Sequence, residues 1–352
     1  MIWAACKDPG GLNVVLPVVK ALRVKYPVNI VTNGPMVAEN LLSQNEPFIY
    51  AGSLGEAVEF MDLLSTELFF TSMCSSGIGI ELSGYLKGLF PTVMLQDFWG
   101  AWLSDFGEDH QAEYICVNDK TDAGFVEKAW PNFPKNNIKI TGYPSFDKYA
   151  SIDCVSIRQK VYSELKLDPT RPMVLFAGQL WYTADALHEV VYALNQIRRD
   201  VYFVPRFHPR MMRTPEWERE KTNCLDALSR YRGSLIEDTY MFDGPTILAA
   251  ADVVTGMFTT MLLEAAALGK PNVSVLYPDS GMKQFRAECP NLSEFPLVEM
   301  GCTYKATKGD ELVQALSRVL ENSNELRANQ EKNFKLDGQN TKRVADFIES
   351  LL

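Results

Sequence analysis

The chain has 352 residues, of which 47% are hydrophobic and 22% are charged, and its formal net charge at pH 7 is −10. A chain of this length and composition is typical of a globular protein with two domains. The acidic balance argues against nucleic acid as the main partner, although a local basic patch could still bind phosphate. The sequence shows no signal peptide and no apolar run long enough to span a membrane, so we expect a cytoplasmic protein without a transmembrane segment.

Cysteine and histidine usage argues against a metal site. The seven Cys residues are scattered with no C-x-x-C pair, and the three His residues form no H-E-x-x-H motif. Isolated Cys of this kind are typical of reduced, mostly buried thiols in a cytoplasmic protein. We therefore expect neither a structural metal nor a bound cofactor.

The first 150 residues alternate short apolar strands with helices. Residues 2–6 predict a strand, a Gly-rich turn follows, and residues 12–24 have the apolar spacing of a helix. Further strands are expected at 28–32, 47–50, 67–71, 92–95, 113–117 and 137–141, and further helices at 35–43, 55–64, 77–89 and 119–129. Strands that are apolar on both faces and separated by helices predict a parallel sheet with helices on both sides. Residues 1–150 are therefore interpreted as one doubly wound domain.

Ligands of such sheets bind at the carboxyl ends of the strands, so the loops there are the candidate sites. The first loop is residues 7–11 (KDPGG), in which Gly10 and Gly11 would let a ligand approach the backbone. A plain tight turn explains these glycines equally well, because no G-x-G-x-x-G motif is present. The loops at 72–79 and 96–105 follow later strands in the same way.

The loop QDFWGAWLSD carries Asp97 directly after a strand, with Trp99 and Trp102 close behind. An Asp beside large aromatic rings can act as a base with a raised pKa against the face of a sugar. A helix cap or a turn residue is the commoner role for an Asp in this position. Asp105 and Asp109 are weaker alternatives for the base.

The second half repeats the architecture of the first. We place the linker after the segment TGYPS, so that a second domain covers residues 151–335 and a closing helix lies in residues 336–352. Residues 172–177 predict an apolar strand that runs into Gly178 and a helix at 184–197. Further strands are expected at 201–206, 234–237, 251–255 and 272–276, and further helices at 155–165, 245–250, 312–320, 326–334 and 344–352.

A basic cluster follows the strand at residues 201–206. Arg206, His208 and Arg210 stand together there in an otherwise acidic protein. Arg binds phosphate through two parallel hydrogen bonds, and His can donate to phosphate or act as an acid or base. A turn residue before Pro is the alternative reading of His208.

Residues 245–271 (PTILAAADVVTGMFTTMLLEAAALGKP) predict a strand, a tight turn and a helix that starts near Thr259. Thr259 and Thr260 can cap this helix while leaving backbone N–H groups free for an anion such as a diphosphate. Glu264, one turn further in, could then accept hydrogen bonds from the two hydroxyls of a ribose. A strand, a capped helix and a surface Glu explain the same residues with equal weight.

Two successive parallel α/β domains of this kind resemble the GT-B superfamily. VYFVPRFHPR is similar to the His-Pro turn of nucleotide-sugar 2-epimerases, such as the UDP-N-acetylglucosamine enzymes, and of CDP-polyol phosphotransferases. ADVVTGMFTTMLLEAAALGKP looks like the donor-binding strand and helix of the superfamily, and TGYPSFD resembles the segment that precedes its second domain. The resemblance covers most of the chain, and its specific motifs lie in the second half. It implies two Rossmann-like domains facing a cleft.

The resemblance also implies roles for single residues. Glu264 would hold the nucleotide ribose, Thr259 and Thr260 would hold its phosphates, and His208 would lie near the diphosphate. Gly10 and Gly11 would face the cleft, and Gly178 and Arg206 belong to the same expected donor site. The chain departs from the epimerases and the phosphotransferases in the residues around Thr259, and from the epimerases in its first loop.

The expected function is that of a metal-independent glycosyltransferase. It would move a hexosyl or N-acetylhexosaminyl group from a nucleoside-diphosphate sugar, with UDP as the first candidate, to an unknown acceptor. The donor would bind the second domain. The acceptor would bind the first domain near Asp8, Trp99 and Trp102, with Asp97 as the base and His208 as a second catalytic candidate. A 2-epimerase or hydrolase, and an inactive nucleotide-sugar-binding protein, are the alternatives, and a homodimer is left open.

Overall fold

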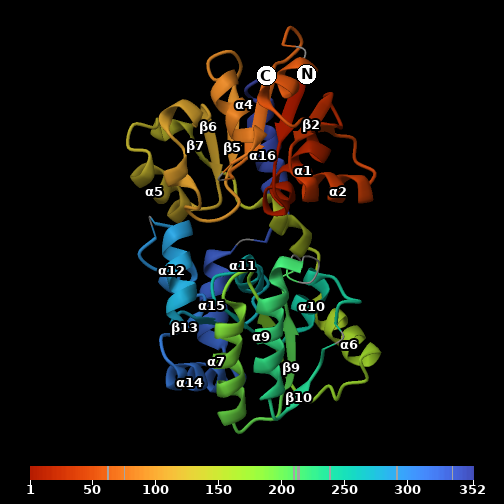
Figure 1. The fold of residues 1–352 in the computed structure, drawn as a ribbon, viewed down its shortest axis with the longest axis vertical. Helices are drawn as coiled ribbons and strands as arrows, with labels where there is room; N and C mark the ends of the chain where they lie inside the picture. The colour runs from red at the N-terminus through yellow and green to blue at the C-terminus, as the bar shows by residue number, and fades with distance from the viewer. Residues whose placement is uncertain are drawn as a thin grey trace. The chain divides into compact units, whose positions relative to one another are not determined.

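The computed structural model describes residues 1–352 except 62, 75, 209, 210, 212–214, 238, 291 and 335. The chain divides into two compact units, which Figure 1 shows. The first unit contains Met1–Lys148, Glu288–Leu292 and Asp337–Leu352, and the second contains Tyr149–Ala287 and Ser293–Leu336. The end of the chain therefore returns to the first unit, which the sequence pattern did not indicate.

The first unit is built on one parallel sheet of seven strands in the order β3-β2-β1-β4-β5-β6-β7. The strands are β1 (Ile2–Ala5), β2 (Val28–Thr32), β3 (Ile49–Tyr50), β4 (Leu68–Ser72), β5 (Thr92–Leu95), β6 (Tyr114–Val117) and β7 (Ile138–Ile140). The order reverses between β1 and β4, which is the position where doubly wound sheets bind ligands. The loops after these two strands are therefore the central ones of the unit.

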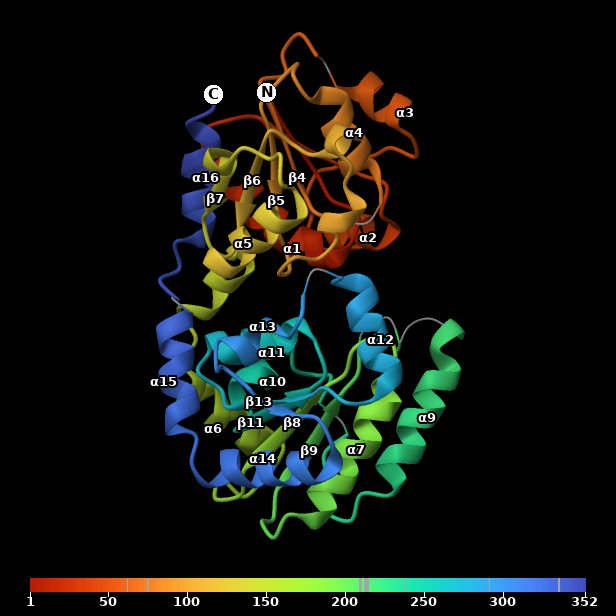
Figure 2. The same ribbon diagram turned by 90° about the vertical axis from the view of Figure 1, so that its left-hand side faces the viewer.

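Helices cover both faces of the first sheet, as Figure 2 shows. They are α1 (Pro9–Leu22), α2 (Pro35–Ser43), α3 (Leu54–Phe60), α4 (Ile78–Leu86), α5 (Lys120–Ala129) and α16 (Asn340–Glu349). Apolar side chains of α1 and α16 share one core cluster with the sheet, and those of α3 and α4 share a cluster on the opposite face. Because successive residues of a strand point to opposite faces, strands that are apolar throughout fill both clusters.

The second unit repeats this plan with six parallel strands in the order β10-β9-β8-β11-β12-β13. The strands are β8 (Met173–Ala177), β9 (Tyr202–Arg206), β10 (Ser234–Leu235), β11 (Val253–Gly256), β12 (Asn272–Val275) and β13 (Tyr304–Ala306). The helices are α6 (Cys154–Glu164), α7 (Thr183–Gln196), α9 (Glu218–Ser229), α10 (Gly244–Ala250), α11 (Thr260–Ala267), α12 (Asp279–Glu288), α13 (Pro296–Glu299), α14 (Gly309–Glu321) and α15 (Asn324–Asn333). Apolar side chains of α7, α9 and α14 pack on one face of this sheet in a single cluster.

The expected fold class is confirmed, and every expected strand and helix is present with ends shifted by a few residues. The sequence pattern did not predict α9, α12, α13 or β13. The short edge strand β13 owes its extended conformation to pairing with β12, which a local apolar pattern does not reveal. Within the described part of the chain, none of the helices combines the length and the apolarity that a membrane span requires.

Close packing between strands gives one stability prediction. A Cβ added at Gly256 in β11 would lie 2.6 Å from the carbonyl oxygen of Ala177 in β8, which is too close for the neighbouring backbone to accept. Gly256→Ala is therefore expected to lower the free energy of unfolding of the second unit by about 1–3 kcal/mol. Urea denaturation followed by circular dichroism measures this loss.

The matched control is Gly124→Ala in the exposed interior of α5, where an added Cβ meets no atom within 4 Å. Alanine has the higher helix propensity, so this variant is expected to gain about 0.5–1 kcal/mol. A loss in Gly124→Ala as large as that in Gly256→Ala would contradict the packing argument.

Candidate functional site

Two carboxylates meet at the carboxyl edge of the first sheet. Asp8 follows β1 and Asp97 follows β5, and a Cβ added at Gly10 would lie 3.2 Å from Asp8 Oδ1 and 3.2 Å from Asp97 Oδ2. Cys74 follows β4, and burial together with the same Asp8 carboxylate raises the pKa of its thiol. Three loops that are far apart in the sequence thus place acidic and polar side chains around Gly10.

The environment of Asp97 shifts its proton affinity. Burial raises the pKa of Asp97 well above its usual value, and the charge of Asp8 raises it further. The buried Asp97 Oδ1 has no hydrogen-bond partner among the described residues. Burial and nearby carboxylates thus raise this pKa in the expected direction, and the role of Asp97 as a base stays a prediction. A carboxyl group whose pKa is raised towards neutrality is a more effective general base than an ordinary Asp.

Asp8 also has a structural role. It is the N-cap of α1, and its Oδ1 accepts a hydrogen bond from Gly11 N at 2.8 Å. A carboxylate at this position is favoured by the positive end of the helix dipole. Capping engages Oδ1, so the acceptor-binding role expected for Asp8 stays a prediction.

The two tryptophans of the 96–105 loop lie in different environments. Trp99 is only 2% exposed, and its indole N–H donates to Asp119 Oδ2 at 2.8 Å. Asp119 is the N-cap of α5, so Trp99 joins the loop to that helix. A buried ring offers little surface to an acceptor, so the structure lends no support to the acceptor-binding role expected for Trp99, which stays a prediction. Trp102 is half-buried and packs at the margin of the local apolar cluster, so only its exposed part could contact one.

Close packing explains the glycines that follow the first strand of each unit. A Cβ at Gly11 would lie 2.1 Å from Ser72 Oγ, and a Cβ at Gly178 would lie 3.1 Å from the carbonyl oxygen of Arg206. Each glycine therefore lets the chain approach a neighbouring strand end closely. These contacts support the tight-turn reading, and the expected ligand contacts of Gly10, Gly11 and Gly178 stay predictions.

At the carboxyl edge of the second sheet, Arg206 ends β9 next to β8. Its guanidinium donates to the carbonyl oxygens of Thr239 at 3.3 Å and Phe242 at 2.9 Å. Burial lowers the pKa of Arg206, and the nearby groups Tyr240 and Asp243 act in the opposite direction. A half-buried guanidinium that donates to carbonyl oxygens keeps its positive charge available to an anion.

The start of α11 lies at the same edge, after β11, which pairs with the other side of β8. Thr259 is the N-cap, and its side chain accepts a hydrogen bond from Met261 N at 3.4 Å. Thr260 is exposed in the first turn. The predicted helix start at Thr259 is therefore observed, and the positive end of its dipole lies at the strand ends that carry Arg206.

Glu264 and His208 are both partly exposed. The carboxylate of Glu264 acts on the hydroxyl of the buried Tyr149, and burial together with this carboxylate raises the pKa of Tyr149. A ribose would therefore share the Glu264 carboxylate with Tyr149. His208 lies two residues after Arg206, and its carbonyl accepts a hydrogen bond from Met211 N at 2.9 Å. Arg210, the third member of the expected basic cluster, lies outside the described residues.

No protein-family model and no curated protein matches the sequence, whereas solved structures match along its whole length. A glycosyltransferase from Rickettsia africae has a TM-score of 0.63 at 11% identity, over 99% of this chain and 97% of that one. A UDP-GlcNAc 2-epimerase from Neisseria meningitidis has 0.65 at 12%, over 99% of both chains. The wall teichoic acid polymerase TagF has 0.60 at 10%, over 99% of this chain and 88% of that one.

The chain has the GT-B fold. Identities of this order show the fold alone, and the three neighbours differ in their chemistry. The expected GT-B resemblance is confirmed at the level of two doubly wound units.

Some residues of the two candidate site regions carried no signal in the sequence. Tyr149 and Cys74 contact Glu264 and Asp8 only through tertiary structure. Tyr240 stacks against Arg206, with 5.4 Å from the guanidinium carbon to the ring centroid. Among the described residues, no three His, Cys, Asp or Glu side chains gather closely enough to hold a metal ion.

Proposed function

We propose that the chain binds a nucleoside-diphosphate sugar at the carboxyl edge of its second unit and transfers the sugar to an acceptor. The observation that carries this proposal is the half-buried Arg206 guanidinium at the same sheet edge as the start of α11. A diphosphate placed there accepts charge-assisted hydrogen bonds from Arg206. It also accepts hydrogen bonds from the backbone N–H groups at the helix terminus. Among proteins of the same fold, the Neisseria epimerase was captured with UDP-GlcNAc, which supports a uridine nucleotide as the first candidate.

In the proposed reaction, the acceptor hydroxyl attacks the anomeric carbon of the donor while the bond to the diphosphate breaks. Asp97 takes the hydroxyl proton, and the nucleoside diphosphate leaves with the bonding electron pair. Arg206 and the α11 terminus stabilise the charge that develops on the leaving group, which is a role that metal ions take in other enzymes. Metal independence is part of the proposal, and unchanged turnover in excess EDTA is its expected result.

The proposed location is the cytoplasm. The seven cysteines are scattered along the sequence without a C-x-x-C pair, which supports a reducing compartment.

A nucleotide-binding screen tests the donor site. UDP, CDP, GDP and TDP are titrated into the protein by calorimetry with EDTA present. Thr260→Glu places a carboxylate in the first turn of α11, where it favours the helix but repels a diphosphate. This variant is expected to weaken binding at least about tenfold with no loss of thermal stability.

Arg230→Gln is the matched control, because Arg230 is an exposed cation at the C-cap of α9, paired with Asp226 at 2.8 Å. It is expected to bind as the wild type does. Absence of binding by all four nucleotides would contradict a nucleoside diphosphate as the donor. Equal affinities of Thr260→Glu and wild type would place the ligand elsewhere.

Turnover separates the transferase from its two alternatives. A 2-epimerase or hydrolase consumes the donor without an acceptor, and added acceptors do not accelerate it. An inactive binding protein binds the nucleotide and turns over nothing. Acceptor-dependent release of the nucleoside diphosphate is the result expected here.

A further inference from the structure

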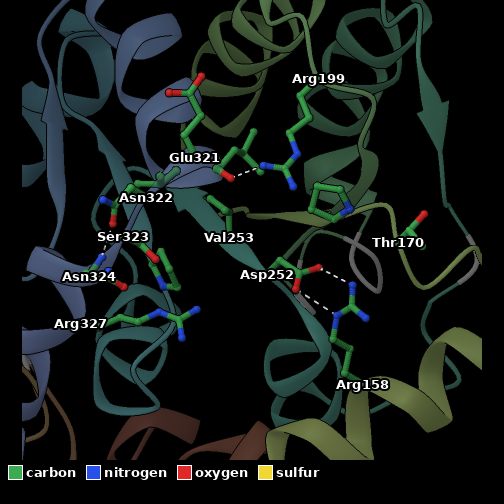
Figure 3. Close-up of a pocket in the computed structure, with 14 residues that line it drawn as sticks. Arg158, Thr170, Arg199, Asp252, Val253, Glu321, Asn322, Ser323, Asn324 and Arg327 are labelled. Carbon is green, nitrogen blue, oxygen red and sulfur yellow. Dashed lines mark hydrogen bonds and ion pairs between the residues drawn. The ribbon is translucent and has the colours of Figure 1, made fainter.

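A second pocket lies at the opposite edge of the second sheet, away from the proposed donor site. Its volume is about 610 Å³, and it opens at the amino ends of three neighbouring strands. Pro172 precedes β8, Val253 begins β11 and Pro271 precedes β12, and all three line it. The end of α14 and the start of α15 complete the wall. Figure 3 shows this pocket with its charged side chains.

The one carboxylate at the floor of the pocket is already neutralised. Asp252 forms a two-pronged ion pair with Arg158, with 3.0 Å between Nε and Oδ1 and 3.0 Å between Nη2 and Oδ2. Its Oδ2 also accepts from Tyr162 OH at 3.0 Å and from Met173 N at 2.8 Å. Asp252 and Arg158 therefore form a closed structural pair that leaves little negative charge for other groups.

Two further arginines line the pocket without a carboxylate partner among the described residues. Arg199 donates to the carbonyl of Leu320 near the end of α14, which engages only part of its five N–H donors. Arg327 has no side-chain hydrogen bond or ion pair with any described residue, and it is exposed. Figure 3 shows the Glu321 carboxylate pointing away from Asp252 and Arg327. The cationic side chains thus outnumber the anionic ones in an acidic protein.

The start of α15 adds to this positive character. Residues 322–324 line the pocket. The N-cap Ser323 makes no side-chain capping hydrogen bond, and Asn322 Oδ1 accepts from Asn324 N at 3.0 Å, which leaves the other N–H groups of the first turn for a ligand. The positive end of the α15 dipole therefore faces the same space as Arg327, which lies one turn into that helix. The ordinary alternative is that Arg199 only caps α14 and Arg327 is solvated, but neither role accounts for the two arginines and a helix start around one hollow.

We propose that this pocket is a second anion site that binds a phosphate-bearing ligand through Arg199, Arg327 and the start of α15. A phosphate group has enough oxygens to take hydrogen bonds from two guanidinium groups at once. The Arg158–Asp252 pair forms the floor and fixes the strand ends. This proposal does not depend on the nucleotide site, because the two sites lie at opposite ends of the same strands.

Pyrophosphate and inorganic phosphate are the probes, titrated by calorimetry into the full chain and into the Thr260→Glu variant. Because Thr260→Glu blocks the proposed donor site, saturable pyrophosphate binding that persists in this variant reports the second pocket. In that background, Arg199→Gln and Arg327→Gln are each expected to weaken pyrophosphate binding about tenfold or more.

Arg318→Gln is the matched control, because Arg318 lies on α14 close to the pocket but pairs with Glu325 at 2.9 Å and is not a lining residue. It is expected to leave pyrophosphate affinity unchanged. Loss of all binding in Thr260→Glu, or an equal loss in Arg318→Gln and Arg327→Gln, would overturn the proposal. The second outcome would indicate diffuse electrostatic attraction. Thermal midpoints without probe confirm that each variant is folded.

Discussion

Replacement of Asp97 by Asn is expected to lower the rate of sugar transfer by a factor of about 10²–10⁴, which is the usual contribution of a general base. The isosteric amide keeps the shape of the side chain near Asp8 but cannot take a proton. The measurement is acceptor-dependent release of nucleoside diphosphate, made with the donor that the binding screen identifies. Nucleotide affinity is expected to be unchanged, because Asp97 belongs to the other unit.

The same substitution is expected to stabilise the protein at neutral pH. The pKa of Asp97 in the folded chain is raised above the unfolded value of about 4. Between these two pKa values the folded state holds a proton that the unfolded state has lost, so wild-type stability falls as pH rises through this window. The amide of the variant has no such proton to lose. The thermal midpoint of Asp97→Asn should therefore exceed that of wild type by a margin that grows above about pH 4 and then levels off.

Full activity of the Asp97→Asn variant would show that Asp97 is not the general base. A midpoint difference that does not change with pH would show that Asp97 titrates normally in the folded state. The two readouts are separable, because the stability effect depends on burial and on nearby carboxylates, whereas the rate effect depends on the proposed reaction.

Replacement of Asp8 by Asn is expected to shift the acid limb of the pH–rate profile to lower pH, by about one unit. The negative charge of Asp8 is one cause of the raised pKa of Asp97, and its removal lowers that pKa. Asp97 then becomes deprotonated, and active as a base, at a lower pH. Asn is as good an N-cap as Asp, so the hydrogen bond from Gly11 N is expected to remain.

Asp119→Asn is the matched control for this experiment. Asp119 caps α5 in the same way, accepting from Asp122 N at 2.9 Å, but it is not a cause of the pKa shift of Asp97. Its acid limb is expected to coincide with that of wild type. A shift of the acid limb in both variants, or in neither, would show that the Asp8–Asp97 pair does not determine the pH dependence of the rate.

The position of the two carboxylates agrees with the general behaviour of doubly wound sheets. Asp8 follows β1 and Asp97 follows β5, on either side of β4, where the strand order has just reversed. The crevice at such a reversal is open because the two adjoining helices lie on opposite faces of the sheet. The GT-B fold therefore supplies the location, whereas the chemistry depends on which side chains the loops carry there.

Local sequence pattern was sufficient for the α/β class and for the positions of the main elements. Strands such as β8 (MVLFA) are apolar on both faces, and helices such as α14 carry a regular apolar stripe, so burial dictates each of them locally. The start of α11 at Thr259 could also be predicted from the sequence, because capping depends on a few neighbouring residues. The pattern did not reveal α12 or β13, whose stability comes from packing and pairing with distant elements.

Only the tertiary structure decided how the candidate residues are used. Asp97 was predicted from its place after a strand, but its partner Asp8 is 89 positions away, and the two meet only because β1 and β5 lie in one sheet. The sequence placed Trp99 near the acceptor, yet its ring is buried and its N–H donates to Asp119. The amino-edge pocket joins strand ends and helix ends from residues 158 to 327, and no local pattern marks it. The sequence by itself determines the chemistry of each side chain. The burial of a side chain and its distance from other side chains depend on long-range packing.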